Sequence, residues 1–440
     1  MSYDLTNTDA TIHGRFWFPD NPEKIYEGYI SLVTGQYAIL NLHTYETNGL
    51  IELGSESHKP LFRNRKIIHG VNDHGDDLTL YRCYANTSGT LLMAKVQYEC
   101  QTLFEGVKQA YDELSFNGID MHFDFQETWV AKTAFTTYHE TRNDKKDLAK
   151  VTIPFCEKKS IDLNISKYAA SEIYCGYSSS RSYDSLTFKH RSSINISFES
   201  AKSVEDIFNL VRQWEWILSL LTRKTVRIKT LDLKLDNHHY LGSDEVLKPI
   251  KFWKRREINN LQKKEPNQHD LYCTFSDIES EFTQIFNNWL DIQSSWEAVL
   301  HRFFATTQPR DIWVNEEFLF LAQAIESIHR IRTGAAGTVD FNKAAKEVYL
   351  AAPTDLKSEI GHRQTFQKQL HLSRNYYTHY GSPNPQECEH ILEGTNLADL
   401  NEKLRWIIES AIMIEIGIPD NIISKIWSHQ WRGHWVTYKD

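Results

Sequence analysis

The spacing of hydrophobic residues changes once along this chain of 440 residues, near residue 270. Before that point apolar residues alternate with polar ones, as in strands that bury one face. After it they recur every three or four residues, as in amphipathic helices. Strands followed by helices are typical of an α+β chain, and the length suits two domains. We therefore predict an α+β multidomain protein, with a β-rich domain at residues 1–270 and an all-α domain at residues 271–440.

The first part of the chain contains several segments in which apolar and polar residues alternate. The clearest are Ile119 to Phe125, Ile161 to Ile165, Ile194 to Phe198 and Leu231 to Leu235. Turn-forming clusters at residues 73–77 and 143–146 separate segments of this kind. This pattern predicts an antiparallel sheet with one buried and one solvated face.

One helix is predicted within the sheet region. Ser203 and Asp206 have the spacing of an N-terminal cap, and an apolar stripe with helical spacing follows from Ile207 to Leu221. We expect this stripe to pack on an open face of the sheet. Residues 236–268 follow neither period, and the run 248–264 is rich in Lys and Arg. That run fits a solvated connector between domains, or alternatively a basic groove for RNA.

The second part of the chain predicts four helices that pack as a bundle. The first starts at a capping box, Ser276 with Glu279, and the second carries an apolar seam. The third is expected to run from Pro353 to about Tyr380, and the fourth starts near Asn396. The apolar positions are Ile278, Phe282, Ile285 and Trp289 in the first helix and Val314, Phe318, Leu321, Ile325 and Ile328 in the second. Trp427, Trp431 and Trp435 follow in the tail, where they cover the core or, alternatively, stack on bases.

Composition limits what the chain can bind over its whole surface. The net charge of -9 predicts that any nucleic-acid site is a local basic patch. Six cysteines without a CxxC pair indicate neither a zinc site nor a disulfide framework, so no metal or cofactor is expected. The polar N-terminus does not resemble a signal peptide, and no apolar run is long enough to span a bilayer. We expect a cytoplasmic protein without a membrane segment.

The candidate for chemistry lies near the end of the third predicted helix. Arg374 and Asn375 are followed, after three residues, by His379. Histidine can donate or accept a proton near neutral pH, and arginine offers a charged fork for phosphate oxygens. Together they suit metal-independent cleavage of RNA, in which a ribose 2′-hydroxyl attacks the adjacent phosphorus. The alternative is that Arg374 forms a surface ion pair and His379 caps the helix.

Helix geometry adds a constraint to this pair. Residues five apart point about 140° away from each other around a helix. One helix therefore does not easily bring Arg374 and His379 to the same phosphate. Two copies of the chain related by a two-fold axis can do so if this helix lies at a homodimer interface. A homodimer is the expected partner arrangement.

The segment SRNYYTHY, residues 373–380, resembles the RNxxxH signature of the HEPN superfamily of helical-bundle ribonucleases. Its flanks are similar to the ApeA-like HEPN branch of bacterial anti-phage proteins, where an earlier helix carries a segment similar to FLFLAQAIESIHR, residues 318–330. The N-terminal region resembles the β-rich ApeA N-terminal domain, through HGRFWFP at residues 13–19 and IHGVNDHGDDLTLYRC at residues 68–83. The resemblance covers both halves of the chain in the same order.

The resemblance implies specific roles for four residues. Arg374 and His379 match the catalytic pair, and Asn375 matches the polar residue after the arginine. Glu326 falls where this branch has an acidic residue, and would hold Arg374 or His379 in position. Alternatively, Glu326 pairs with Arg330 one turn later.

The resemblance also implies an activity and partners. The expected activity is an endoribonuclease that arrests the infected host, leaving 2′,3′-cyclic phosphate and 5′-hydroxyl ends on RNA, with tRNA as one candidate substrate. The expected assembly is a homodimer through the HEPN domain, with a phage-derived trigger acting on the N-terminal domain. The alternative is a HEPN dimer that binds RNA or a partner protein without cleaving anything.

Overall fold

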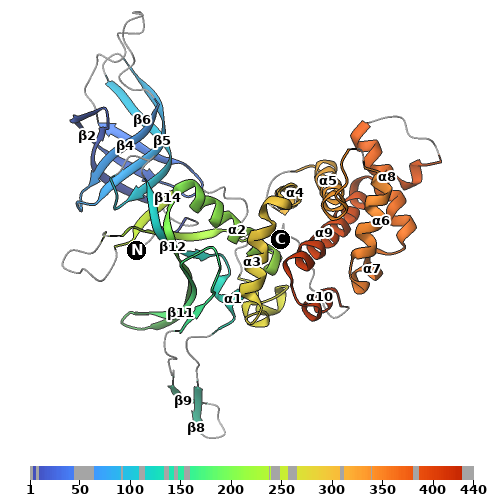
Figure 1. Cartoon of the computed structure of the whole chain (residues 1–440). Helices are drawn as coiled ribbons and strands as arrows, with labels where there is room; N and C mark the ends of the chain where they lie inside the picture. Colours follow the sequence, from blue (N-terminus) through green and yellow to red (C-terminus); the bar gives the residue numbers. More distant parts are fainter. Residues whose placement is uncertain are drawn as a thin grey trace, which may run out of the picture. The chain divides into compact units, whose positions relative to one another are not determined.

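The computed structural model describes the chain except residues 1–2, 6–8, 44–63, 91–92, 109–113, 133–137, 143–146, 153–158, 237, 239–247, 256–264, 308–311, 338, 380–385 and 429–440. The chain divides into two compact units (Figure 1). The first comprises residues 1–126, 134–211 and 227–261, and the second residues 127–133, 212–226 and 262–440. The β-rich and helical regions confirm the predicted fold class.

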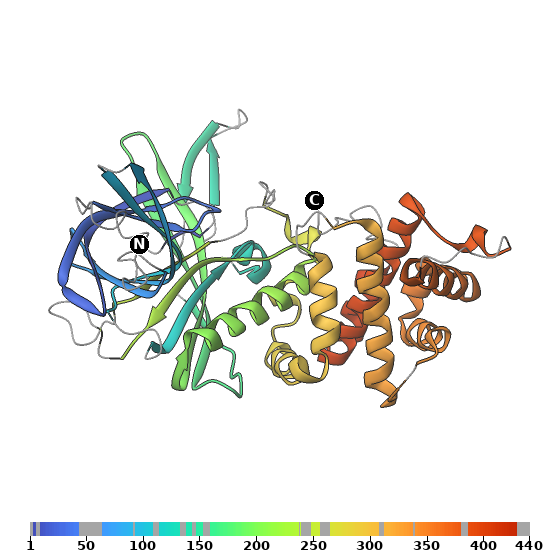
Figure 2. The same ribbon diagram turned by 90° about the horizontal axis from the view of Figure 1, so that it is seen from above.

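Six strands of the first unit close into an antiparallel barrel, which Figure 2 presents as a ring. Closure depends on β6, which pairs with β5 along one edge and with β3 along the other. The remaining pairs run β3–β2–β1–β4–β5. The barrel strands are β1 (Ala10–Phe18), β2 (Asn21–Leu32), β3 (Ala38–His43), β4 (Arg65–Asn72), β5 (Asp77–Thr90) and β6 (Met93–Glu105).

The barrel needs two glycines where its strands approach one another. Gly14 of β1 lies directly opposite Gly28 of β2. A Cβ at Gly14 would collide with the carbonyl oxygen of Val71, and one at Gly28 with that of Asn41. Each collision is with the backbone of a neighbouring strand, which cannot move aside without breaking the ladder.

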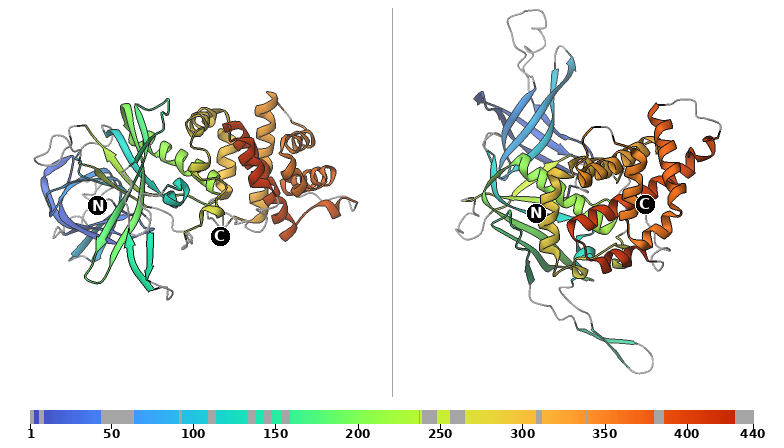
Figure 3. Two further views of the ribbon diagram at one scale, coloured as in Figure 1. Left: turned by 90° about the horizontal axis from the view of Figure 1, so that it is seen from below. Right: turned by 45° about the vertical axis from the view of Figure 1, so that its right-hand side comes forward.

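The second half of β6 continues into an open sheet, where its free edge pairs with β14. The order from there is β14–β13–β7–β12–β11–β10, and β8 and β9 form a separate two-stranded sheet (Figure 3). The bounds are β7 (Ser115–Phe123), β8 (Tyr138–Arg142), β9 (Asp147–Thr152), β10 (Lys159–Asp162), β11 (Ala170–Arg181), β12 (Leu186–Ser203), β13 (Ile228–Lys234) and β14 (Ile250–Lys254).

The predicted alternating segments coincide with strands of this sheet, but three of the four extend beyond them, and Leu235 lies one residue past the end of β13. Phe125 follows β7 in a left-handed conformation with φ of 59°. Leu163 and Ile165 are buried but follow β10, because their amides bond to the backbone and hydroxyl oxygens of Ser171 instead of to a strand ladder. The predicted turn at 73–77 joins β4 to β5, where Asn72 accepts hydrogen bonds from two turn amides. The turn at 143–146 lies outside the described residues.

Helix α2 (Val204–Thr222) begins where the sequence predicts, with the Ser203 hydroxyl accepting from the amide of Asp206 at 3.2 Å. The expectation that its whole stripe covers the sheet is wrong. The ring of Phe208 packs 5.3 Å from that of Phe252 on β14, but Trp214 packs 4.1 Å from Phe286 of α3 (Phe282–Ser295). Residues 204–211 thus belong to the first unit and residues 212–222 to the second. An apolar stripe does not specify which surface will cover it.

The helical unit has more helices than the four predicted. The unit includes α1 (Gln126–Val130), the second part of α2, and α3. These are followed by α4 (Glu297–Thr307), α5 (Val314–Thr333), α6 (Phe341–Ala351), α7 (Thr354–Ile360), α8 (Arg363–His379), α9 (Gly394–Ile416) and α10 (Asp420–Trp427). The predicted third helix is two, because Gly361 has a φ of 91° that a helix cannot accommodate. The predicted Ser276–Glu279 capping box is wrong. Thr274 and Asp277 form that box on a short 3-10 turn, while Ser276 bonds to the carbonyl of Val130.

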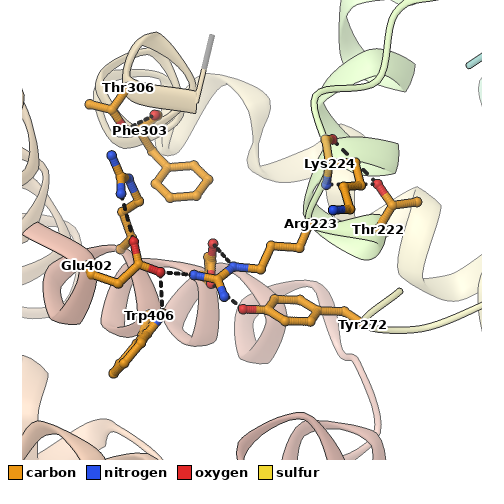
Figure 4. A network of polar contacts seen from close by, with 10 residues as sticks. Thr222, Arg223, Lys224, Tyr272, Phe303, Thr306, Glu402 and Trp406 are labelled. Carbon is orange, nitrogen blue, oxygen red and sulfur yellow. Dashed lines mark hydrogen bonds and ion pairs between the residues drawn. The ribbon is translucent and has the colours of Figure 1, made fainter. Parts of the chain in front are cut away.

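A buried polar network joins the end of α2 to α9 (Figure 4). The side chain of Arg223 pairs with Glu402 and lies 3.8 Å from Glu409. The hydroxyl of Tyr272 donates to Glu409 at 3.0 Å, and the indole of Trp406 donates to Glu402 at 2.9 Å. Removing one partner of a buried ion pair typically costs about 3–5 kcal/mol, so this network fixes the C-terminal end of α2 within the helical unit. Trp427, predicted to cover the core, is buried, while Trp431 and Trp435 lie outside the described residues.

Candidate functional site

Helix α8 carries the candidate residues and is anchored on its buried face. Ser373 and Tyr377 are buried there, and both bond to the backbone of Leu392. The Ser373 hydroxyl accepts from the Leu392 amide at 3.0 Å, and the Tyr377 hydroxyl donates to the Leu392 carbonyl at 3.0 Å. Tyr377 also packs edge-on against Phe318 of α5, 5.9 Å away. These contacts fix the rotation of α8, and so the directions in which the residues between them point.

Arg374 lies beside α5 and α6, with 31% of its side chain exposed. Its guanidinium sits 5.4 Å from the ring centre of Phe341 on α6. A guanidinium over an aromatic face is attracted by the ring and keeps its donors at the edge available. The partly exposed edge of this cation is therefore what α8 offers to an anionic ligand.

Glu326 of α5 divides its carboxylate between two arginines. One oxygen accepts from Arg330 at 2.7 Å, and the other lies 3.8 Å from Arg374. Both arrangements considered from the sequence are thus present together, the i to i+4 pair with Arg330 and the contact with Arg374. Two guanidinium groups share one carboxylate, so these three described side chains carry one positive charge in excess. That excess charge favours a phosphate at the exposed edge of Arg374.

Asn375 links Arg374 to a histidine that the sequence analysis did not select. The Arg374 guanidinium donates to the Asn375 side-chain oxygen at 3.4 Å, a long hydrogen bond. The Asn375 side-chain nitrogen lies 3.1 Å from Nε2 of His371, one turn earlier on α8. The i to i+4 spacing of His371 and Asn375 was the available signal, because residues four apart share a helix face.

His379 is the last residue of α8 and is exposed to solvent. Within the described part of the chain, it forms no hydrogen bond or ion pair with another residue. The structure therefore brings Glu326, Arg374 and Asn375 together and leaves His379 separate from them. Residues 380–385, which include the predicted stop signals Gly381, Pro383 and Pro385, lie outside the described residues.

Neither a metal-binding cluster nor a membrane-spanning helix occurs among the described residues. No three His, Cys, Asp or Glu side chains among them gather in a group that could hold a metal ion. None of the helices in that part of the chain is both long enough and apolar enough to span a membrane.

Comparison with known protein families identifies both halves of the chain. The family of ApeA N-terminal domain 1 matches residues 11–289, and the Apea-like HEPN family matches residues 319–422. The second match runs from α5 into α10 and includes Glu326, Arg374, Asn375 and His379. No curated protein and no solved structure gives a significant match. Because the first match covers more than half of the 440 residues, and the second follows it in the expected order, this chain belongs to the family of ApeA-type proteins with an ApeA-like HEPN domain.

Proposed function

We propose that this protein is a metal-independent endoribonuclease that acts in anti-phage defence by arresting the infected host. The observation that carries the proposal is the unbalanced positive charge at Arg374, on the same helix as the exposed His379 and inside the region matched by the HEPN family. Arg374 would bind the phosphate, and His379 would transfer protons. Both roles need side chains that solvent and RNA can reach, and both side chains are accessible.

The proposed reaction breaks one phosphorus–oxygen bond and forms another. The ribose 2′-oxygen attacks the adjacent phosphorus while its proton passes to a base, and the 5′-oxygen leaves with a proton from an acid. The products are a 2′,3′-cyclic phosphate and a 5′-hydroxyl. Arg374 stabilises the negative charge that builds on the phosphate oxygens, and His379 serves as the acid or the base.

The proposed active unit is a homodimer. Arg374 and His379 are about 140° apart around α8, and about 7.5 Å apart along its axis. Arg374 is held toward α5 and α6, whereas the exposed His379 forms no hydrogen bond or ion pair with any residue that the structure describes. In a dimer with α8 near the two-fold axis, His379 of one chain would act beside Arg374 of the other.

The test is RNA cleavage by the purified full-length protein in EDTA, with Arg374→Ala and His379→Ala. Each change is expected to lower the cleavage rate by at least about a hundredfold, because each removes a group acting in the transition state. His362→Ala is the matched control, since His362 is an exposed histidine beside the start of the same helix. If the folded wild-type chain cleaves no cellular RNA, or both variants stay active, the alternative of a non-catalytic RNA- or protein-binding dimer is favoured.

Mixed dimers extend the same experiment to the composite site. Chains with Arg374→Ala and chains with His379→Ala are unfolded or exchanged together and then assayed. Because one of the two sites in a mixed dimer would keep both groups, part of the wild-type rate should return. No recovery in dimers shown to have exchanged would mean that each chain forms its own site.

The proposed role of the N-terminal region is to sense a phage-derived trigger or to hold the ribonuclease inactive. A map of 2′,3′-cyclic phosphate ends in total RNA, before and after infection, tests this role and identifies the substrate, with tRNA as one candidate. Ends that appear only after infection, and only with an intact Arg374, are the expected outcome. Equal cleavage in uninfected cells would argue against control by infection.

A further inference from the structure

Three side chains on one face of α8 form a chain of hydrogen bonds that leads to the candidate phosphate-binding residue. Arg374 donates to Oδ1 of Asn375 at 3.4 Å, and Nδ2 of Asn375 lies 3.1 Å from Nε2 of His371. The other ring nitrogen of His371, Nδ1, is buried and has no hydrogen-bond partner among the residues that the structure describes. The proposed reaction assigns no role to His371.

The chemistry of the three groups settles which atom donates at each step. A guanidinium carries donors only, so the amide of Asn375 must turn its oxygen toward Arg374. The amide nitrogen, which also carries donors only, then faces His371. Nε2 of His371 must therefore accept, which means that it carries no proton. The ring proton of neutral His371 must then be on Nδ1.

This arrangement leaves one group unsatisfied. The Nδ1–H of His371 is buried without an acceptor among the described residues, and burying an unpaired donor lowers the stability of the fold. A purely structural side chain at this position would gain by being apolar, because it would avoid that loss. An imidazole is favoured over an apolar side chain here only if the hydrogen bond accepted by its Nε2 contributes more than the unpaired Nδ1–H costs.

We infer that His371 is a positioning residue, which fixes the amide of Asn375 so that its oxygen points at Arg374. With His371 as acceptor, the amide has one favourable orientation, and Arg374 gains a second oxygen contact beside Glu326. Without the acceptor, the amide turns freely and no longer directs Arg374. The inference rests on the proposed function for its effect on cleavage, but not for its geometry.

The first experiment compares two substitutions of His371 in the full-length protein. Gln at this position keeps an acceptor within reach of Asn375 one turn later, whereas Leu removes it. His371→Leu is expected to lower kcat by about tenfold to a hundredfold, as for a misplaced catalytic group, with a smaller change in KM. His371→Gln is expected to retain most of the wild-type kcat. Equal losses in the two variants, or no loss in either, would overturn the inference.

The unfolding temperature separates positioning from packing. His371→Leu removes a buried unpaired donor, so its thermal midpoint is expected to equal or exceed that of the wild type. A lower midpoint together with lost activity would mean that His371 acts through packing alone. If His371→Leu does not fold, Asn375→Leu serves instead, because it removes the link between the two neighbours. Asn375→Leu should lower kcat as His371→Leu would. An unchanged kcat would contradict the positioning role of His371.

A measurement independent of cleavage tests the hydrogen-bond directions. Nitrogen NMR of the full-length protein with labelled histidine distinguishes the two neutral ring tautomers, and His371→Gln assigns the signal. We expect the Nδ1–H tautomer at neutral pH, and a shift toward the mixed tautomers of free histidine in Asn375→Leu. An Nε2–H tautomer in the wild type would overturn the inference. If the wild type cleaves no RNA, the proposed function fails. The tautomer of His371 and the unfolding midpoints still test whether His371 positions Asn375.

Discussion

At the scale of single residues, the candidate site is organised by the sharing of one carboxylate. Glu326 contacts both Arg330 and Arg374, with the shorter distance to Arg330. Arg330 is therefore the partner that neutralises Glu326, and Arg374 is held in place while keeping most of its charge for a ligand. An isolated Glu326–Arg374 pair would satisfy Arg374 more fully and compete with a phosphate.

Burial also changes the pKa of a single carboxyl group in the sheet, that of Asp120. Asp120 lies on β7 directly opposite Asp232 of β13. Burial, with a further contribution from Asp232, raises the pKa of Asp120 to about 6, although Lys234 acts in the opposite direction. The folded protein therefore binds this proton more tightly than the unfolded chain does. Above about pH 6 the charged form of Asp120 destabilises the fold, and this loss fades as the pH falls toward 4.

Asp120→Asn is accordingly expected to stabilise the first unit at pH 7, by at most about 3 kcal/mol, because it removes a buried charge. The gain should shrink as the pH is lowered and vanish near pH 4. Urea unfolding at a series of pH values measures this difference. Asp162→Asn, at an exposed position of β10, is the control and should change little at any pH. A gain that does not depend on pH would show that charge burial is not its cause.

At the scale of elements, the break between α7 and α8 decides how the candidate helix is presented. Gly361 has φ 91° and ψ -159°, a combination that is open essentially only to glycine. The carbonyl of Gly361 accepts from the hydroxyl of Tyr349 on α6 at 2.8 Å, and that of Ile360 accepts from Lys403 on α9 at 3.0 Å. The break is thus held from two sides, and α8 starts in a fixed direction.

Gly361→Ala is expected to destabilise the helical unit by about 1–3 kcal/mol through backbone strain. Collision is not the cause, since a Cβ at Gly361 would meet no atom within 4 Å. Gly334→Asn is the matched control. Gly334 also has a positive φ, of 66°, but lies in the left-handed region at the end of α5, which asparagine tolerates. Chemical unfolding followed by circular dichroism compares the two, and equal losses would contradict the strain argument.

At the scale of the whole molecule, the helical unit is not a continuous piece of chain. It includes residues 127–133 and 212–226 as well as everything from residue 262 onward. Trp129 packs 5.7 Å from Phe282, and Trp216 stacks on Phe304 at 4.9 Å. Arg223 enters the buried network of α9. The helical unit therefore takes part of its core from segments that precede residue 270.

A fragment of residues 271–440 is accordingly expected to lack cooperative unfolding or to aggregate, because it would expose aromatic surface and leave Glu409 buried without Arg223. Co-expression with a fragment of residues 1–270 should restore a soluble complex, since that fragment carries both missing segments. Thermal unfolding and gel filtration measure both outcomes. A fragment 271–440 that melts cooperatively at the temperature of the whole chain would contradict this expectation. The domain boundary at residue 270 stays a prediction until then.

The amino-acid pattern was sufficient for what depends on neighbours along the chain. The change of period near residue 270, the Ser203 cap of α2 and the strands around Ile119, Ile194 and Leu231 each report local burial on one face, and each was predicted. Family resemblance pointed to Arg374 and His379. The four-helix prediction missed α4, α6 and α10, and Gly361 divided the predicted third helix into α7 and α8.

Pairings between residues far apart in the sequence were decided only by the tertiary structure. Barrel closure depends on the two edges of β6, one of which pairs with the preceding strand β5 and the other with the more distant β3. The division of α2 between two units depends on which aromatic surfaces meet Phe208 and Trp214. The sharing of Glu326 between two helices, and the buried Nδ1 of His371, likewise exist only once α5 and α8 are packed together. Periodicity records that a residue is buried, whereas the partner that buries it is set by long-range packing.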